Sequence, residues 1–228
     1  GVARIHARNG DFQAAQRAVE QAATHKDRLS QREAMEFDAF VARFNSPQAA
    51  METSKTWATM YPDAYRAYYS YSIAALEDGE YARGLSFLSP ALNSKNPSQA
   101  NAWFLQGVLS LAQNRYPEAK VAFQRADSMG LGGDKLEEAE LFAAQREFGQ
   151  ADRALATQTP SGMRAADGRL GLDAPNFLFD QGKWDAGQAA LSTLLVQFDK
   201  SLPAQSNALR GTALAIDDYL GKLQSGQW

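Results

Sequence analysis

The sequence predicts an all-α protein built from repeated helical hairpins, and three observations lead to this fold class. A short corner motif recurs along the chain at intervals of 35, 34, 35, 35 and 33 residues. Apolar residues follow the helical period, as in Phe37, Phe40, Val41 and Phe44. The alternation of apolar and polar residues that is typical of half-buried strands is absent. Evenly spaced units of this length indicate helix pairs that stack on one another.

The corner motif is a Gly or Asn, followed in four of the six copies by an aromatic residue two positions later and in all six by a small residue five positions later. The copies at Asn45 and Gly149 are degenerate. Gly and Asn tolerate the left-handed backbone that ends a helix, and a small residue lets two helices approach closely. The expected corners are Gly10, Asn45, Gly79, Asn114, Gly149 and Gly182. The small residues that follow them are Ala15, Ala50, Gly84, Ala119, Ala154 and Gly187.

Start and stop signals place the individual helices between these corners. Ser30 with Glu33, and Asp134 with Glu137, have the spacing of a capping box. Proline at position 62 or 97 marks a point where one pair ends and the next begins. The expected pairs are 1–24, 27–61, 63–95, 98–129, 134–160 and 163–200, and a last helix over 204–223 is expected to cover the open end. The whole chain, 1–228, is expected to form a single superhelical domain.

Composition and charge disfavour some partners and exclude some kinds of chemistry. The net charge is −3 and the basic residues are scattered among acidic ones, which disfavours nucleic acid as a partner. Cysteine is absent, so disulfides and thiol chemistry are excluded. No apolar run approaches the roughly 20 residues of a membrane helix, and we expect no direct membrane contact. Because the chain begins at Gly1 within what reads as a helix, we expect it to be a fragment of a longer protein.

The fourth pair resembles the tetratricopeptide repeat, both in its spacing near 34 residues and in its signature positions. Those positions are occupied by Trp103, Gly107, Tyr116, Ala119, Phe123 and Ala126. Gln106 stands where the family has Leu, and Pro175 replaces the signature Gly in the sixth pair, where we expect a kink or a helix that starts late. The resemblance implies a right-handed α-solenoid that acts in protein–protein interaction.

A second, shorter resemblance concerns the stretch from Asp27 to Glu33. It is similar to a stretch in the tetratricopeptide regions of bacterial multidomain signalling proteins, where the repeats follow a kinase, a nucleotide cyclase or a winged-helix regulator. This resemblance implies a sensing or docking arm. It favours a periplasmic or other extracytoplasmic location over the cytoplasm.

The resemblance also implies where a partner binds, because in this family the first helix of each pair lines a concave groove. The lining positions lie thirteen, ten, six and three residues before each corner, on one helical face. The predicted groove residues are Arg66, Tyr69, Ile73, Asn101, Phe104, Val108, Arg169 and Leu172. This lining is mostly apolar, and it lacks the Lys and Asn pattern that grips a C-terminal carboxylate. We expect a peptide or protein partner, with Tyr69 and Phe104 as anchors. The alternative is that neighbouring helices fill the same positions.

No catalytic, cofactor or metal site is predicted, and we expect the chain not to be an enzyme. His6 and His25 lie nineteen residues apart without a nearby ligand cluster. The glycine-rich stretch 130–135 lacks the preceding strand and the Lys-Ser/Thr ending of a phosphate loop.

Two other functions compete with a peptide-binding scaffold. One is a structural spacer or dimerisation arm, in which a homodimer buries the groove. The other is recognition of RNA by related helical repeats of about 35 residues, which use polar side chains and positive charge. The apolar lining and the net charge of −3 argue against RNA.

Overall fold

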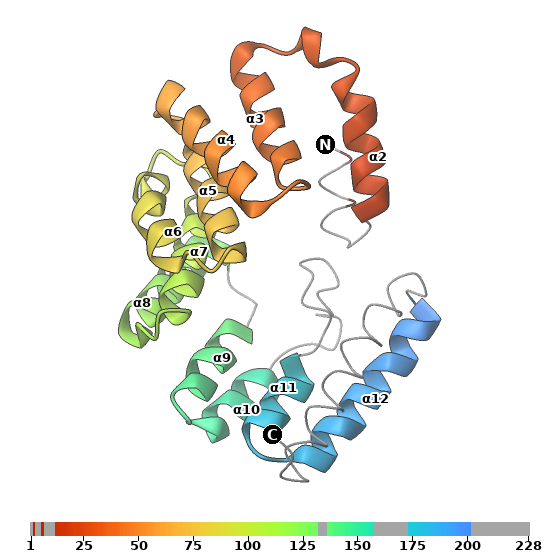
Figure 1. Ribbon diagram of the computed structural model, residues 1–228. Helices are drawn as coiled ribbons and strands as arrows, with labels where there is room; N and C mark the ends of the chain where they lie inside the picture. Colours follow the sequence, from red (N-terminus) through yellow and green to blue (C-terminus); the bar gives the residue numbers. More distant parts are fainter. Residues whose placement is uncertain (1, 3–5, 7–11, 132–135, 157–172, 202–228) are drawn as a thin grey trace. The chain divides into compact units, whose positions relative to one another are not determined.

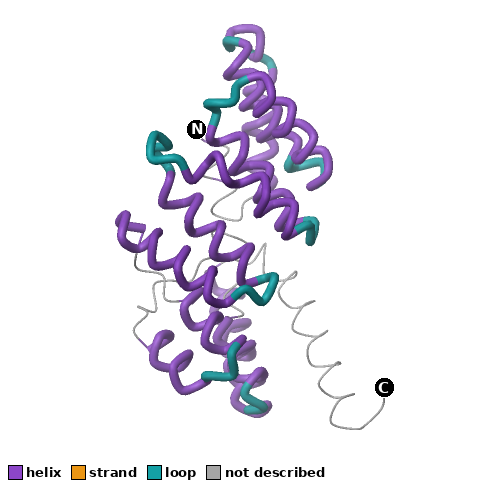
Figure 2. Tube along the Cα trace, turned by 90° about the vertical axis from the view of Figure 1, so that its left-hand side faces the viewer, coloured by secondary structure: helices purple, strands orange, loops and turns teal. Residues whose placement is uncertain are grey.

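The structure is a computed structural model, and its described part is α-helical without any β-strand, as the sequence predicts (Figures 1 and 2). The described residues are 2, 6, 12–131, 136–156 and 173–201. The helices fall into two compact units, one built around Phe12–Gln158 and the other around Thr159–Trp228.

The first unit is a series of short helices joined by tight turns. Its α-helices are α2 (Phe12–Ala23), α3 (Gln31–Ala42), α4 (Pro47–Met60), α5 (Tyr65–Glu77), α6 (Tyr81–Leu88), α7 (Gln99–Leu111), α8 (Tyr116–Ala126), α9 (Leu136–Ala144) and α10 (Phe148–Ala156). Shorter helical turns are η1 (Lys26–Arg28), η2 (Ser89–Leu92) and η3 (Asp127–Leu131). The described helices of the second unit are α11 (Asp173–Asp180) and α12 (Trp184–Ser201).

Consecutive helices of the described part pack against each other in pairs. Within each of the expected ranges 27–61, 63–95, 98–129, 134–160 and 163–200, two consecutive helices pack against each other. In the first range, 1–24, the described part contains α2. The last helix expected over 204–223 lies outside the described residues, and so does Gly10. The chain's organisation as a single domain stays a prediction.

Three of the expected corners adopt the left-handed conformation. The φ angles are 77° at Gly79, 57° at Asn114 and 72° at Gly182. At Gly79 the backbone N–H donates to the carbonyl of Leu76, and the next N–H, of Glu80, donates to the carbonyl of Ala75. The same two hydrogen bonds recur at the other two corners. This is the Schellman arrangement, which satisfies the last carbonyls of the first helix in each pair.

The fifth corner lies three residues before the expected position, so the prediction of Gly149 is wrong. Arg146 carries the left-handed conformation, with φ 62°, and makes the same two hydrogen bonds. Gly149 is inside α10. The small residue five positions after the true corner is Ala151, which is fully buried. The Schellman hydrogen bonds fix this corner, and a residue with a Cβ occupies it although glycine would suit it better.

The second corner is built differently, and Asn45 is not left-handed. The backbone N–H groups of Asn45 and Ser46 both donate to the carbonyl of Ala42. Ser46 is extended, and its hydroxyl accepts a hydrogen bond from the N–H of Ala49 at the start of α4, with Pro47 at the first helical position. A serine cap followed by proline begins the next helix at once, so this corner needs no left-handed residue.

One of the two expected capping boxes lies within the described residues, and it is present. Ser30 and Glu33 form the expected capping box at the start of α3, and the Ser30 hydrogen bonds lower the pKa of the Glu33 carboxyl. Asp134 lies outside the described residues. Pro175 is the third residue of the described part of α11, Asp173–Asp180. The residues before Asp173 lie outside the described part, so the expected kink or late start stays a prediction.

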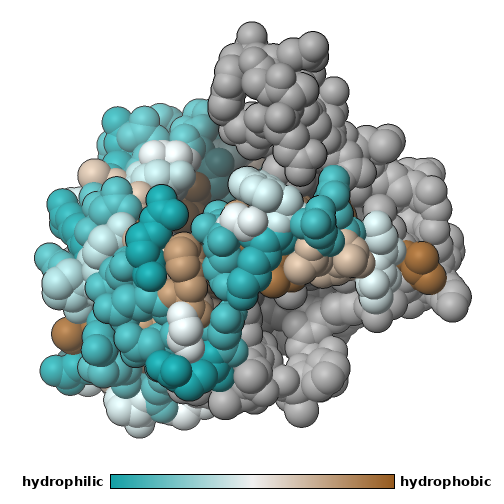
Figure 3. All heavy atoms as spheres, turned by 90° about the horizontal axis from the view of Figure 1, so that it is seen from below, coloured by the Kyte–Doolittle hydropathy of each residue, from teal (hydrophilic) through white to brown (hydrophobic). Residues whose placement is uncertain are grey.

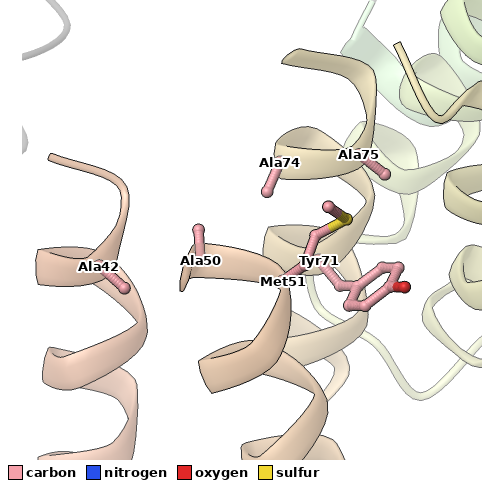
Figure 4. Packing of buried hydrophobic residues seen from close by; sticks show 6 residues of the cluster. All are labelled: Ala42, Ala50, Met51, Tyr71, Ala74 and Ala75. Carbon is pink, nitrogen blue, oxygen red and sulfur yellow. The ribbon is translucent and has the colours of Figure 1, made fainter. Parts of the chain in front are cut away.

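Small residues sit where the helices cross. Ala15, Ala50 and Ala119 are fully buried, and Gly84 and Gly187 are buried. Figure 4 shows Ala42 of α3, Ala50 and Met51 of α4, and Tyr71, Ala74 and Ala75 of α5 around one such crossing. These six residues form a single core cluster, which joins the second pair to the third.

Two glycines are required by close contacts with an aromatic ring. A Cβ added to Gly107 of α7 would overlap the ring of Phe123 in α8, and a Cβ added to Gly187 of α12 would overlap the ring of Phe179 in α11. A Cβ on Gly149 of α10, in contrast, would enter open space. The two ring contacts hold the helices of a pair at a short distance.

Gly107→Ala is expected to lower the free energy of unfolding by about 1–3 kcal/mol, because the added methyl group collides with Phe123. Urea denaturation followed by circular dichroism measures the change. Phe123→Leu in the Gly107→Ala background is the matched control, since a smaller side chain makes room for the methyl group. A Gly107→Ala chain as stable as the wild type would contradict the contact.

Gly149→Ala and Arg146→Gly test the position of the fifth corner. If Arg146 is the left-handed residue, Gly149→Ala adds a helix-forming residue inside α10 and stabilises the chain by about 0.5–1 kcal/mol. Arg146→Gly relieves a left-handed residue and stabilises by a similar amount, about 0.5–1 kcal/mol. The same denaturation experiment reads both. If Gly149→Ala lowers the free energy of unfolding instead, Gly149 and not Arg146 is the left-handed residue of this corner.

Candidate protein-binding surface

The first helices of the second, third and fourth pairs carry three parallel rows of apolar residues. α5 contacts both α3 and α7, so residues at equivalent positions on the three helices lie in rows. We call these nine residues the apolar strip: Met35, Tyr69 and Phe104; Ala39, Ile73 and Val108; Ala42, Leu76 and Leu111. Ala39 and Ala42 are buried and the other seven are half-buried. The strip therefore combines partial solvent exposure with large apolar side chains.

Polar and charged residues frame the two ends of the strip. At one end Arg32, Arg66 and Asn101 are exposed. The Arg66 guanidinium lies 2.6 Å from a carboxylate oxygen of Glu36. At the other end Arg43 lies 2.5 Å from a carboxylate oxygen of Glu77. Glu36 lies in α3 and Arg43 directly follows it, while Arg66 and Glu77 lie in α5. Both ion pairs therefore join the second pair to the third.

Tyr69, one of the two predicted anchors, is half-buried. It packs against the core cluster that contains Leu88, Leu105 and Leu109, and this burial raises the pKa of its phenol, while Arg43 and Arg66 act in the opposite direction. The phenol is therefore neutral at ordinary pH. Ile73 and Leu76 pack against the same cluster. Tyr69, Ile73 and Leu76 thus help to hold the third pair against the fourth.

Phe104 and its neighbours on α7 are also half-buried or exposed. The ring of Phe104 packs at a tilt against Phe123, with 5.8 Å between the ring centroids. Val108 is half-buried and Asn101 is exposed. These three predicted groove residues lie on the same helix face as the spacing rule requires.

The two groove residues predicted for the sixth pair, Arg169 and Leu172, lie outside the described residues. Further along the same predicted face, Phe179 is half-buried and stacks on Trp184, with 6.1 Å between the centroids. This contact belongs to the second unit.

The corrected corner at Arg146 assigns inner positions in the fifth pair that the sequence analysis did not name. They are Glu140, six residues before the corner, and Ala143, three residues before it. Glu140 is half-buried and Ala143 is buried. The signal was available, because Ala144-Gln145-Arg146-Glu147-Phe148 repeats the pattern of Ala112-Gln113-Asn114-Arg115-Tyr116. In both copies the glutamine amide donates to the carbonyl four residues earlier.

The described residues contain neither a cluster of metal-ligating side chains nor a helix that could span a membrane. Among them there is no group of three or more His, Asp or Glu side chains placed to hold a metal ion. None of the helices from α2 to α12 is both long and apolar enough, over its described residues, to cross a bilayer. In Figure 3 the described surface is mainly hydrophilic, with hydrophobic residues in separate spots. Exposed apolar residues such as Val121 and Met129 lie away from the strip, on α8 and η3.

Comparison with known proteins agrees with this geometry for the central part of the chain. Residues 88–130 match the family model described as a tetratricopeptide repeat. A search of curated proteins finds no significant match to the chain. The matched segment runs from the end of α6 through α7 and α8, and it includes Asn101, Phe104 and Val108. Tetratricopeptide repeats generally mediate protein–protein interactions. Residues 88–130 are therefore similar to a tetratricopeptide repeat, the family that Trp103, Gly107 and Tyr116 predict.

Proposed function

We propose that the chain is a protein-interaction scaffold that binds a peptide or protein partner on the apolar strip, with Tyr69 and Phe104 as anchors. The observation that carries the proposal is the set of large, half-buried apolar side chains in register on α3, α5 and α7. Aromatic side chains at the centre of a surface with a polar rim are the usual source of binding energy in protein interfaces.

The dimensions of the strip suit a short peptide. Packed helices lie about 8–10 Å apart, so three neighbouring helices span about 20 Å. An extended peptide advances about 3.3 Å per residue, and roughly six residues cross this width. Along α7 the rows from Phe104 to Leu111 cover about 10 Å, which is about two turns of a helix. The strip can therefore accept either an extended segment or one face of an amphipathic helix.

We also propose the setting in which the scaffold acts. The resemblance of the stretch from Asp27 to Glu33 favours a sensing or docking arm of a larger bacterial signalling protein, outside the cytoplasm. Tests of this setting are the full-length reading frame and the location of the complete protein in a fractionated cell.

A spacer or dimerisation arm is the second candidate, and one observation favours it. Tyr69, Ile73 and Leu76 already pack against the cluster around Leu88 and Leu105. If packing is their whole role, no peptide is needed to cover the strip.

Tyr69→Ala and Phe104→Ala are each expected to weaken peptide binding by about thirtyfold or more, the effect of losing a hot-spot aromatic worth 2 kcal/mol. The probes are peptides selected from a display library on the wild-type chain, and fluorescence anisotropy measures their affinity. Tyr81→Ala is the matched control. Tyr81 packs against the same core cluster but lies on α6, outside the strip. Equal affinity in the wild type and both strip variants would place binding elsewhere.

Light scattering on the 228-residue chain separates the scaffold from the dimerisation arm. The scaffold predicts a monomer whose strip is open to a partner. A dimer that survives dilution, and that Tyr69→Ala or Phe104→Ala dissociates, would support the second candidate instead.

A further inference from the structure

The charged residues of α3 and α5 are held by ion pairs within the chain or, at Glu33, by a helix cap. On α3, Arg32 pairs with Asp63 at 3.0 Å and Asp38 pairs with Lys26 at 2.6 Å. Glu33 is held by the Ser30 cap. Glu36 pairs with Arg66, and Glu77 pairs with Arg43, as described above. These contacts account for every Asp, Glu, Lys and Arg within the bounds of α3 and α5.

The first helix of the fourth pair, α7, contains no charged side chain. α7, from Gln99 to Leu111, contains no Asp, Glu, Lys, Arg or His. The amide of Asn101 frames one end of the strip on this helix, and the strip residues of α7 are Phe104, Val108 and Leu111. The surface between α5 and α7 is therefore apolar and uncharged along its length, with its ion pairs confined to the side of α3.

This arrangement discriminates against a charged partner. A charged side chain laid on the strip would lose hydration without gaining an opposite charge, unless it displaced one member of an existing ion pair. An uncharged apolar side chain covers Tyr69, Phe104 and Val108 at no such cost and gains the burial of apolar area. The charge pattern thus selects one class of occupant.

We propose that the segment which docks on the strip is an uncharged peptide segment, with two or more large apolar side chains over α5 and α7 and Ser, Thr, Asn or Gln between them. This inference rests on the proposed function and adds the chemistry of the partner. It distinguishes this surface from one that recognises an acidic or a basic peptide.

Selection of random twelve-residue peptides from a display library tests the partner class. The wild-type chain is the target, and a folded Tyr69→Ala, Phe104→Ala double variant is used for counter-selection. The expected winners carry no net charge and contain aromatic or large aliphatic residues. Winners rich in acidic or in basic residues would overturn the inference. If no peptide prefers the wild type over the double variant, the proposed function fails together with it.

Charge variants at the exposed Asn101 give an independent readout without disturbing the packing. For an uncharged segment, Asn101→Lys and Asn101→Asp are expected to change affinity in the same direction, and by less than about threefold from each other. The same substitutions at Gln124, which is exposed on α8, are the control. Opposite effects at Asn101, with one variant binding more than about tenfold tighter than the other, would assign a charged partner.

The salt dependence of the same peptides completes the test. Between about 0.05 and 0.5 M NaCl the affinity of an uncharged segment is expected to change by less than about twofold, since screening acts on charge pairs. A tenfold weakening over this range would overturn the proposed chemistry, and it would leave the strip itself as the binding surface if Tyr69→Ala still abolished binding.

Discussion

The close approach of neighbouring helices is the constraint on which the rest of the structure depends. It is met by removing side-chain volume at each crossing, at Ala50, Gly84 and Ala119, and by filling the space beside it with a ring or a leucine. A Cβ on Gly84 would meet Ala75 of α5 at 3.1 Å and Leu109 of α7 at 3.3 Å, so one glycine sets the distance of α6 from two helices. Because the third and fourth pairs are packed this tightly, α5 and α7 lie side by side, and their apolar faces form one surface.

The corners matter because they set the rotation of each helix about its axis. The Schellman hydrogen bonds at Gly79 and Asn114 end α5 and α7 at the same point of the repeat. Residues at equal distances before the corner then face the same way. The alignment of Tyr69 with Phe104, and of Ile73 with Val108, therefore follows from the left-handed residues Gly79 and Asn114, which lie outside the apolar strip. A scaffold of this kind transmits sequence spacing directly into the layout of its surface.

Most of the fold could be predicted from the sequence because its determinants are local. Glycine or asparagine at the corner, the aromatic residue after it and the small residue at the crossing all lie within a few residues of one another. The prediction failed at Gly149, where it followed residue identity alone and passed over Arg146, although the Ala-Gln-x-x-aromatic pattern of the fourth pair recurs there. At Asn45 the Ser46 cap and Pro47 replace the left-handed residue. The Schellman hydrogen bonds form at Arg146 without a glycine, and a serine cap replaces them at Asn45, so a corner of this fold requires neither a glycine nor a single pattern of hydrogen bonds.

The candidate surface was harder to predict, because exposure depends on the neighbouring pair. Spacing alone places Tyr69 and Phe104 on one face, but it cannot say how deeply the cluster of Leu88, Leu105 and Leu109 encloses Tyr69. The electrostatic character of the surface has the same origin. The sequence predicts Arg66 as a groove residue but does not show its ion pair. That pair forms because α5 packs beside Glu36 of α3. Non-local packing therefore pairs charges that look separate in the sequence, and it leaves a row of half-buried apolar side chains between them.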